Sequence, residues 1–246
     1  MQTQPEQQPA DLAQHPLRQL LNDEFHSRPA PPLVAPALVS QLVFTHDAAA
    51  LAGECQRVEG AAGRAGLSRL SGSDNAILFA GAGFILRWER HTEFSSYTVF
   101  CSPAIGGETA ATASALDLLP RECLQGIPGQ LIVATHVELR AAAEVSPQSV
   151  TANLSPTGRQ MIAAQVADQA AWVFTDFLLD QGATRFLVLD GSLTPRQAGR
   201  TVQRLLEIET YRLLALLALP VAREIGAWLH DAEEELATMV DHIGEA

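Results

Sequence analysis

The C-terminal part of the chain carries the signal that most constrains its fold. Thr194 is followed by Pro195, a pair typical of a helix N-cap and first helical position. Beyond Pro220, apolar residues recur at spacings of three and four: Val221, Ile225, Trp228, Ala232, Leu236, Met239 and Ile243. Because proline removes a hydrogen bond and crowds the preceding turn, the pattern predicts a long helix kinked or broken at Pro220.

Upstream of this helix, segments rich in β-branched and aromatic residues come in runs. The predicted strands are 39–45, 77–80, 84–100 (consecutive strands), 131–139, 161–166, 172–179 and 185–190. The last two flank a turn-like segment at 180–183, which predicts a β-hairpin. A helix is predicted over 47–64 and a short one after His15. Runs of strands with helices near the two ends favour an α+β fold, with a mostly antiparallel sheet and packed helices.

The same patterns divide the chain into three parts. These are a disordered leader at 1–14, an α+β domain at 15–193, and a C-terminal helical segment at 194–246 with a docking half (194–219) and a coiled-coil-like half (221–243). In the docking half, Glu209 and Arg212 are three residues apart and are predicted to pair.

The composition excludes several classes of function. A formal charge of -12 argues against a nucleic-acid surface, because binding phosphates needs clustered cations. All 16 basic residues are arginine, which excludes a P-loop lysine and a Schiff-base lysine. The three cysteines form no C-x-x-C pair, so a reducing cytoplasm fits best. The longest apolar run, 213–222, is about half of the roughly 20 residues that span a bilayer.

A candidate ligand face lies at 87–93. In a single strand, Arg87, Glu89, His91 and Glu93 would share one face, and two carboxylates beside a histidine suit acid–base chemistry or a hard divalent ion. Two other interpretations remain open. The face is solvated or salt-bridged, or His91 lies in a hairpin turn that breaks the alignment.

A candidate anion site lies on the first turns of the C-terminal helix. Arg196, Arg200 and Arg204 are four residues apart, and cations there oppose the helix dipole. A negative group should offset that cost, either a phosphate, lipid headgroup or acidic partner, or a carboxylate of the same protein such as Asp176 or Asp190.

Six motifs resemble, in the same order, a bacterial family of uncharacterised membrane-anchored proteins, number 3422 of the domain-of-unknown-function series. They are His15–Arg18, His26–Pro29, Trp88–Phe94, Thr175–Phe177, Thr194–Arg200 and Glu207–Arg212. The resemblance covers about 15–223 and supplies no catalytic residue. Family members continue through further helical sequence to C-terminal transmembrane segments, which implies membrane proximity for the longer forms.

We therefore expect a cytoplasmic interaction or assembly module rather than an enzyme, with no span of its own and, in the longer forms, a place at the inner face of the inner membrane. Its partner is expected to be a second copy or another helical protein, contacted through Ile225, Trp228, Leu236 and Met239. The alternative is a metal- or anion-binding enzyme, or an ion-transport regulatory domain, that uses the face from Arg87 to Glu93. The sequence names no cofactor.

Overall fold

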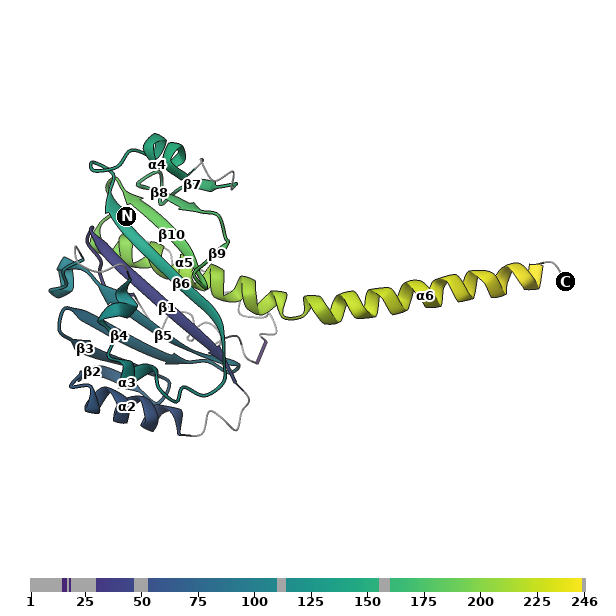
Figure 1. The fold of residues 1–246 in the computed structure, drawn as a ribbon, viewed down its shortest axis with the longest axis horizontal. Coiled ribbons are helices and arrows are strands. Elements are labelled where there is room, and N and C mark those ends of the chain that lie inside the picture. Colours follow the sequence, from purple (N-terminus) through teal and green to yellow (C-terminus); the bar gives the residue numbers. More distant parts are fainter. Residues whose placement is uncertain are drawn as a thin grey trace, which may run out of the picture.

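One large sheet with helices on both faces forms the body of the protein, and a long helix leaves it at the C-terminal end (Figure 1). The structure is a computed structural model that describes residues 15, 16, 18, 30–46, 53–109, 114–154 and 160–244. The architecture confirms the predicted α+β class. The predicted leader and most of the short helix after His15 lie outside the described residues.

Ten strands of the described ranges form this sheet. They are β1 (Ala37–Thr45), β2 (Ser68–Ser73), β3 (Ala76–Gly81), β4 (Phe84–Arg90), β5 (Phe94–Cys101), β6 (Gln130–Ala141), β7 (Ile162–Val166), β8 (Ala171–Thr175), β9 (Leu179–Asp180) and β10 (Ala183–Asp190). Their order is β2-β3-β4-β5-β1-β6-β10-β8-β7, with β9 paired to β10. The β6–β10 pair is parallel and the other pairs are antiparallel, so the sheet is mostly antiparallel, as predicted.

Two details of the strand pattern differ from the prediction. Strand β2 was not predicted, because its small and polar residues, all exposed, carry no apolar alternation. It is an edge strand, where such residues are common. The predicted hairpin at the end of the domain is present, but its first arm is divided into β8 and β9, and β10 pairs antiparallel with both.

The helices and 3-10 turns lie between and after the strands. They are α2 (Glu54–Arg64), η1 (Pro103–Ile105), η2 (Ala115–Leu118), α3 (Arg121–Leu124), α4 (Pro147–Leu154), α5 (Pro195–Leu216) and α6 (Leu219–Gly244). Helix α5 begins as predicted. The Thr194 side chain accepts from the backbone N–H of Gln197, and the Gln197 side chain accepts from that of Thr194, so a capping box fixes its first turn.

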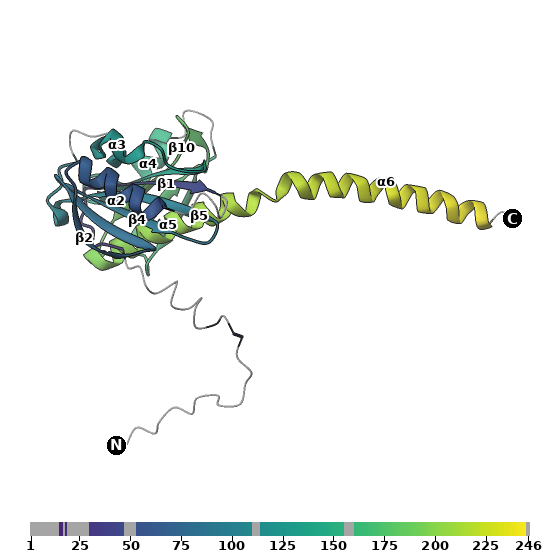
Figure 2. The same ribbon diagram turned by 90° about the horizontal axis from the view of Figure 1, so that it is seen from below.

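Alternation along the central strand separates two hydrophobic cores. Val39 faces α5 and packs in a cluster with Val202 and Leu206, whereas Leu38 faces the opposite side and packs in a cluster with Val58 of α2. Helix α5 therefore covers one face of the sheet, and α2, α3 and η2 cover part of the other (Figure 2).

The segment before β1 also holds the start of α5. The backbone N–H of Leu33 donates to the Pro195 carbonyl (3.0 Å). A Cβ atom on Gly199 would lie 2.3 Å from the Pro31 carbonyl oxygen, so this close crossing of chain and helix requires glycine.

The predicted break in the C-terminal helix is present and lies just before Pro220. Helix α5 ends at Leu216 and α6 begins at Leu219, with a turn at 217–218. Pro220 is in the first turn of α6, where its missing N–H leaves no hydrogen bond unmade. From there α6 extends away from the sheet (Figures 1 and 2).

Candidate functional site

The predicted ligand face is divided between a strand and a turn. Strand β4 ends at Arg90, and the chain reverses before Phe94 to form a hairpin with β5, which agrees with the interpretation that places His91 in a hairpin turn. Arg87 and Glu89 are buried, with 3.1 Å between the Arg87 Nε and a Glu89 carboxylate oxygen. His91 lies in the turn, where its backbone N–H donates to the Phe94 carbonyl and its ring stacks on Phe94.

Arg87 belongs to a row of buried polar residues on the α5 side of the sheet. In register across five strands, the row consists of Arg87, Thr98, Gln41, Thr135 and Thr184. Helix α5 contacts this row at two points: Thr210 donates to the Gln41 side chain (3.1 Å), and Thr184 donates to Glu209 (2.6 Å). The row is interior, and Glu89 beside it is buried as well.

The three arginines of the predicted anion site are exposed on α5. Within the described ranges, no carboxylate lies within 4 Å of Arg196, Arg200 or Arg204. Asp190, one of the expected partners, instead accepts a hydrogen bond from the backbone N–H of Leu193. The row is therefore available to a group from outside the domain.

The predicted interface residues lie on α6, where every side chain that the structure describes is exposed. Ile225 is 51% and Trp228 is 68% exposed, and Leu236 and Met239 are exposed to a similar degree. The seam does not pack on its own domain.

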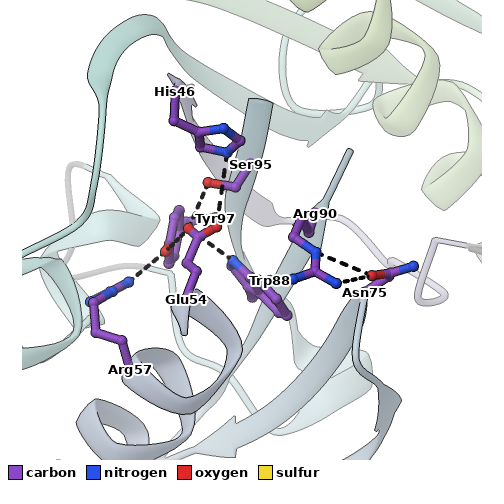
Figure 3. A network of polar contacts seen from close by, with 8 residues as sticks. All are labelled: His46, Glu54, Arg57, Asn75, Trp88, Arg90, Ser95 and Tyr97. Atoms are coloured by element: carbon purple, nitrogen blue, oxygen red, sulfur yellow. Dashed lines mark hydrogen bonds and ion pairs between the residues drawn. The ribbon is translucent and has the colours of Figure 1, made fainter. Parts of the chain in front are cut away.

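A buried carboxylate cluster on the opposite face was not predicted (Figure 3). One oxygen of Glu54, at the start of α2, accepts hydrogen bonds from Ser95 (2.7 Å), Tyr97 (2.7 Å) and the Trp88 indole N–H (3.3 Å). The sequence contains a signal for the burial of Glu54, because Glu54 precedes the buried Val58 by one helical turn and lies on the same face of α2.

The remaining contacts show what the cluster does. The His46 ring is fully buried and lies 3.9 Å from the second Glu54 oxygen, while Arg57 donates to the Tyr97 hydroxyl. Burial raises the pKa of Tyr97 well above its ordinary value, and the Glu54 carboxylate adds to this effect. The cluster attaches α2 to strands β4 and β5.

An open groove is the second feature that the sequence did not predict. It has a volume of about 680 Å³, within the roughly 300–1,000 Å³ typical of small-molecule sites. It lies on the sheet face opposite α5, between η2 and α4, where strands β1, β6, β10 and β8 form its floor. Its polar lining consists of Ser40, Thr109, Ser114, His136, Glu138, Arg140, Thr175, Asp176, Asp180 and Arg185.

Register places a histidine at the polar end of this groove. His136 on β6 lies opposite Ser40 of β1 on one side and Arg185 of β10 on the other. The His136 Nδ1 is 2.8 Å from the Ser40 hydroxyl and 3.2 Å from the Ser114 hydroxyl. Burial lowers the pKa of His136 and Arg185 lowers it further, against the opposite effect of Asp117, so the imidazole is neutral at pH 7.

Four other charged side chains of the groove form two pairs. Arg140 contacts Glu138 (2.7 Å), and the Nε of Arg185 is 3.0 Å from Asp180. Across the residues that the structure describes, no three histidine, cysteine, aspartate or glutamate side chains gather as a metal site would require. None of the described helices combines the length and apolarity needed to cross a membrane.

Comparison with known proteins gives a family and no activity. A family model described as "Protein of unknown function (DUF3422)" matches residues 13–246. No curated protein matches the chain, and no solved structure matches it.

Proposed function

The chain belongs to the DUF3422 family of proteins of unknown function, and from this premise we propose that it is an assembly module whose helix α6 pairs with a helix of a second polypeptide. In the simplest form, the second polypeptide is another copy of the same chain.

The exposed seam of α6 carries this proposal. Its 26 residues make a helix about 39 Å long, enough for more than three heptads. Ile225, Trp228, Leu236 and Met239 expose half or more of their area to water. Full burial of one such side chain is worth about 1.5–3 kcal/mol, so pairing would be strongly favourable.

The charges beside the seam set the conditions under which α6 would pair with itself. Glu233 and Glu235 flank the seam positions Ala232 and Leu236. In a dimer these carboxylates from two helices come together, and like charges repel. Self-association should therefore strengthen with ionic strength, because salt screens exposed charges over about 10 Å at 0.1 M.

Sedimentation equilibrium tests the proposal. We expect a particle larger than the 26.4 kDa monomer at micromolar concentration. Trp228→Glu, which places a charge in the seam, should yield the monomer. His230→Glu is the matched control, because it adds the same charge about 200° around the helix, away from the seam.

Two results would contradict self-pairing through the α6 seam. A monomeric wild type at all salt concentrations would overturn self-pairing and leave a second helical protein as the partner. Association that is equally weakened by Trp228→Glu and His230→Glu would overturn the seam as the interface.

The exposed arginine row on α5 supports a second candidate function, binding to an anionic membrane surface. Arg196, Arg200 and Arg204 have no carboxylate partner within the described ranges, and each basic residue near an anionic membrane contributes about 1 kcal/mol. This candidate agrees with a cytoplasmic position at the inner membrane, which the resemblance to membrane-anchored proteins implies.

Vesicle sedimentation tests this second candidate. We expect binding to vesicles that contain phosphatidylglycerol and weaker binding to phosphatidylcholine vesicles. Arg200→Glu should abolish the difference, whereas Arg69→Glu, on the exposed edge strand β2, should leave most of it. Equal binding to both vesicle types would contradict the assignment.

A further inference from the structure

The floor of the groove has a polar strip along β6 with apolar walls. His136, Glu138 and Arg140 alternate along one face of that strand, and Leu38 and Leu187 flank Glu138 in register on the neighbouring strands. The α4 side of the groove is apolar and is lined by Val145, Val150, Met161 and Phe174. A ligand that fits this lining has a polar end and an apolar body.

Two serines fix the orientation of His136. Ser40 is 1% exposed, and its hydroxyl lies 3.1 Å from the Ser114 hydroxyl and 2.8 Å from His136 Nδ1. Its hydroxyl and that of Ser114 both lie within hydrogen-bond distance of Nδ1, and when a hydroxyl donates to Nδ1 the proton of the neutral ring is on Nε2. Nε2 makes no hydrogen bond within the described part of the chain and is not among the fully buried atoms. In this tautomer Nε2 offers an N–H donor to the groove that His136 lines.

Arg185 supplies the second donor at the same level of the sheet. It lies directly opposite His136 in the β6–β10 pair. Asp180 engages its Nε, while its two Nη groups have no carboxylate or carbonyl partner in the described ranges. The His136 N–H and the Arg185 Nη groups together provide two donors for the two oxygens of one carboxylate.

The acidic groups of the groove limit the charge of the ligand. Glu138, Asp176 and Asp180 line the same groove as the two guanidinium groups. They would repel a dianion such as a phosphate monoester more strongly than a monoanion. We propose that the groove binds a small organic monocarboxylate with an apolar body, whose carboxylate accepts from His136 Nε2 and Arg185 and whose body lies against the α4 wall.

This site is independent of the assembly through α6. Isothermal titration with octanoate and 4-phenylbutyrate measures it, and octanamide is the uncharged comparison. We expect at least one acid to bind with a Kd below about 1 mM and octanamide to bind at least tenfold more weakly than octanoate. In the ¹H–¹³C spectrum, the His136 ring resonance, assigned with His136→Gln, should shift on titration.

Arg185→Gln should weaken binding of the acid roughly tenfold to a hundredfold, because it removes a charge-assisted hydrogen bond. Arg69→Gln is the matched control: Arg69 is 48% exposed and pairs with Glu59, as Arg185 is 46% exposed and pairs with Asp180. Unchanged affinity in Arg185→Gln would overturn the proposal. So would equal affinity for octanoate and octanamide, a His136 resonance that does not move, or no binding of either acid at 10 mM, roughly tenfold above the expected Kd.

Discussion

Helices α5 and α6 follow one another in the chain and have opposite environments. Both carry an apolar stripe at helical spacing. In α5 the stripe is buried against the sheet, with Val202 and Leu206 almost fully covered, whereas in α6 the equivalent stripe is exposed. An apolar stripe thus shows that a helix needs a partner, but not whether that partner lies in the same chain.

The contact between α5 and the sheet also includes buried polar groups, which the exposed seam of α6 lacks. Near the end of α5, Leu213 and Leu214 pack close to Val43. Before them along the helix, Glu209 and Thr210 form hydrogen bonds with the buried polar row. Buried hydrogen bonds of this kind add little net stability, yet they allow only one register between helix and sheet. Helix α5 is therefore fixed in place by polar groups as well as by apolar burial.

The largest expected difference between the two helices comes from a charge placed in each stripe. Val202→Asp puts an unpaired carboxylate into the core and should lower the free energy of unfolding by about 3–5 kcal/mol. Ile225→Asp, on exposed α6, should change it by less than about 0.5 kcal/mol. Urea denaturation of both variants measures the difference. Equal losses would show that α6 packs on the domain after all.

The next largest effect concerns the polar anchor of α5. Glu209 is fully buried and accepts from Thr184 and, through two hydrogen bonds of 2.8 Å, from Arg212. Glu209→Gln should lower the free energy of unfolding by about 1.5–3 kcal/mol, because it replaces charge-assisted hydrogen bonds and turns an amide N–H toward another donor. Glu207→Gln is the control, because Glu207 is only partly buried and bonds to Gln203 on the same helix. If Glu209→Gln lowers the free energy of unfolding by less than about 0.5 kcal/mol, Glu209 does not anchor α5 to the sheet.

Local signals explain what could be predicted about these helices. The Thr194–Pro195 start, the break near Pro220 and the Glu209–Arg212 pair each depend on residues within one or two turns, and all three are present. For the candidate ligand face the sequence left a single strand and a hairpin turn at His91 both open, because nothing local distinguishes them, and the hairpin turn is present.

The groove could not be predicted from the sequence for a different reason. Ser40, Ser114, His136 and Arg185 come from four separate segments, and only the strand order β1-β6-β10 brings them together. The parallel β6–β10 pair is decisive, because an antiparallel pair would have placed other residues opposite His136. Topology of this kind depends on long-range pairing and has no local signature.

A smaller change in the free energy of unfolding tests whether the Thr135 hydroxyl in the polar row under α5 has a hydrogen-bond partner. The Thr135 hydroxyl is buried and has no hydrogen-bond partner in the structure. Thr135→Val keeps the shape and removes the unmet hydroxyl, so the free energy of unfolding should rise by about 1 kcal/mol. Thr135→Ser keeps the hydroxyl and loses a methyl group, and should be destabilising. If Thr135→Val proves destabilising in thermal denaturation, the hydroxyl has a partner in solution.

The smallest expected change in stability comes from removing α6 altogether. A chain that ends at Ala218 keeps Leu213 and Leu214 against the sheet, and the side chains of α6 whose burial the structure describes are all exposed. Its free energy of unfolding should stay within about 0.5 kcal/mol of the full chain at protein concentrations where the full chain is monomeric. At higher concentrations the full chain should gain stability, because association stabilises the folded state by mass action, and the shortened chain should not. Identical concentration dependence in both chains would place the interface on the sheet domain instead of on α6.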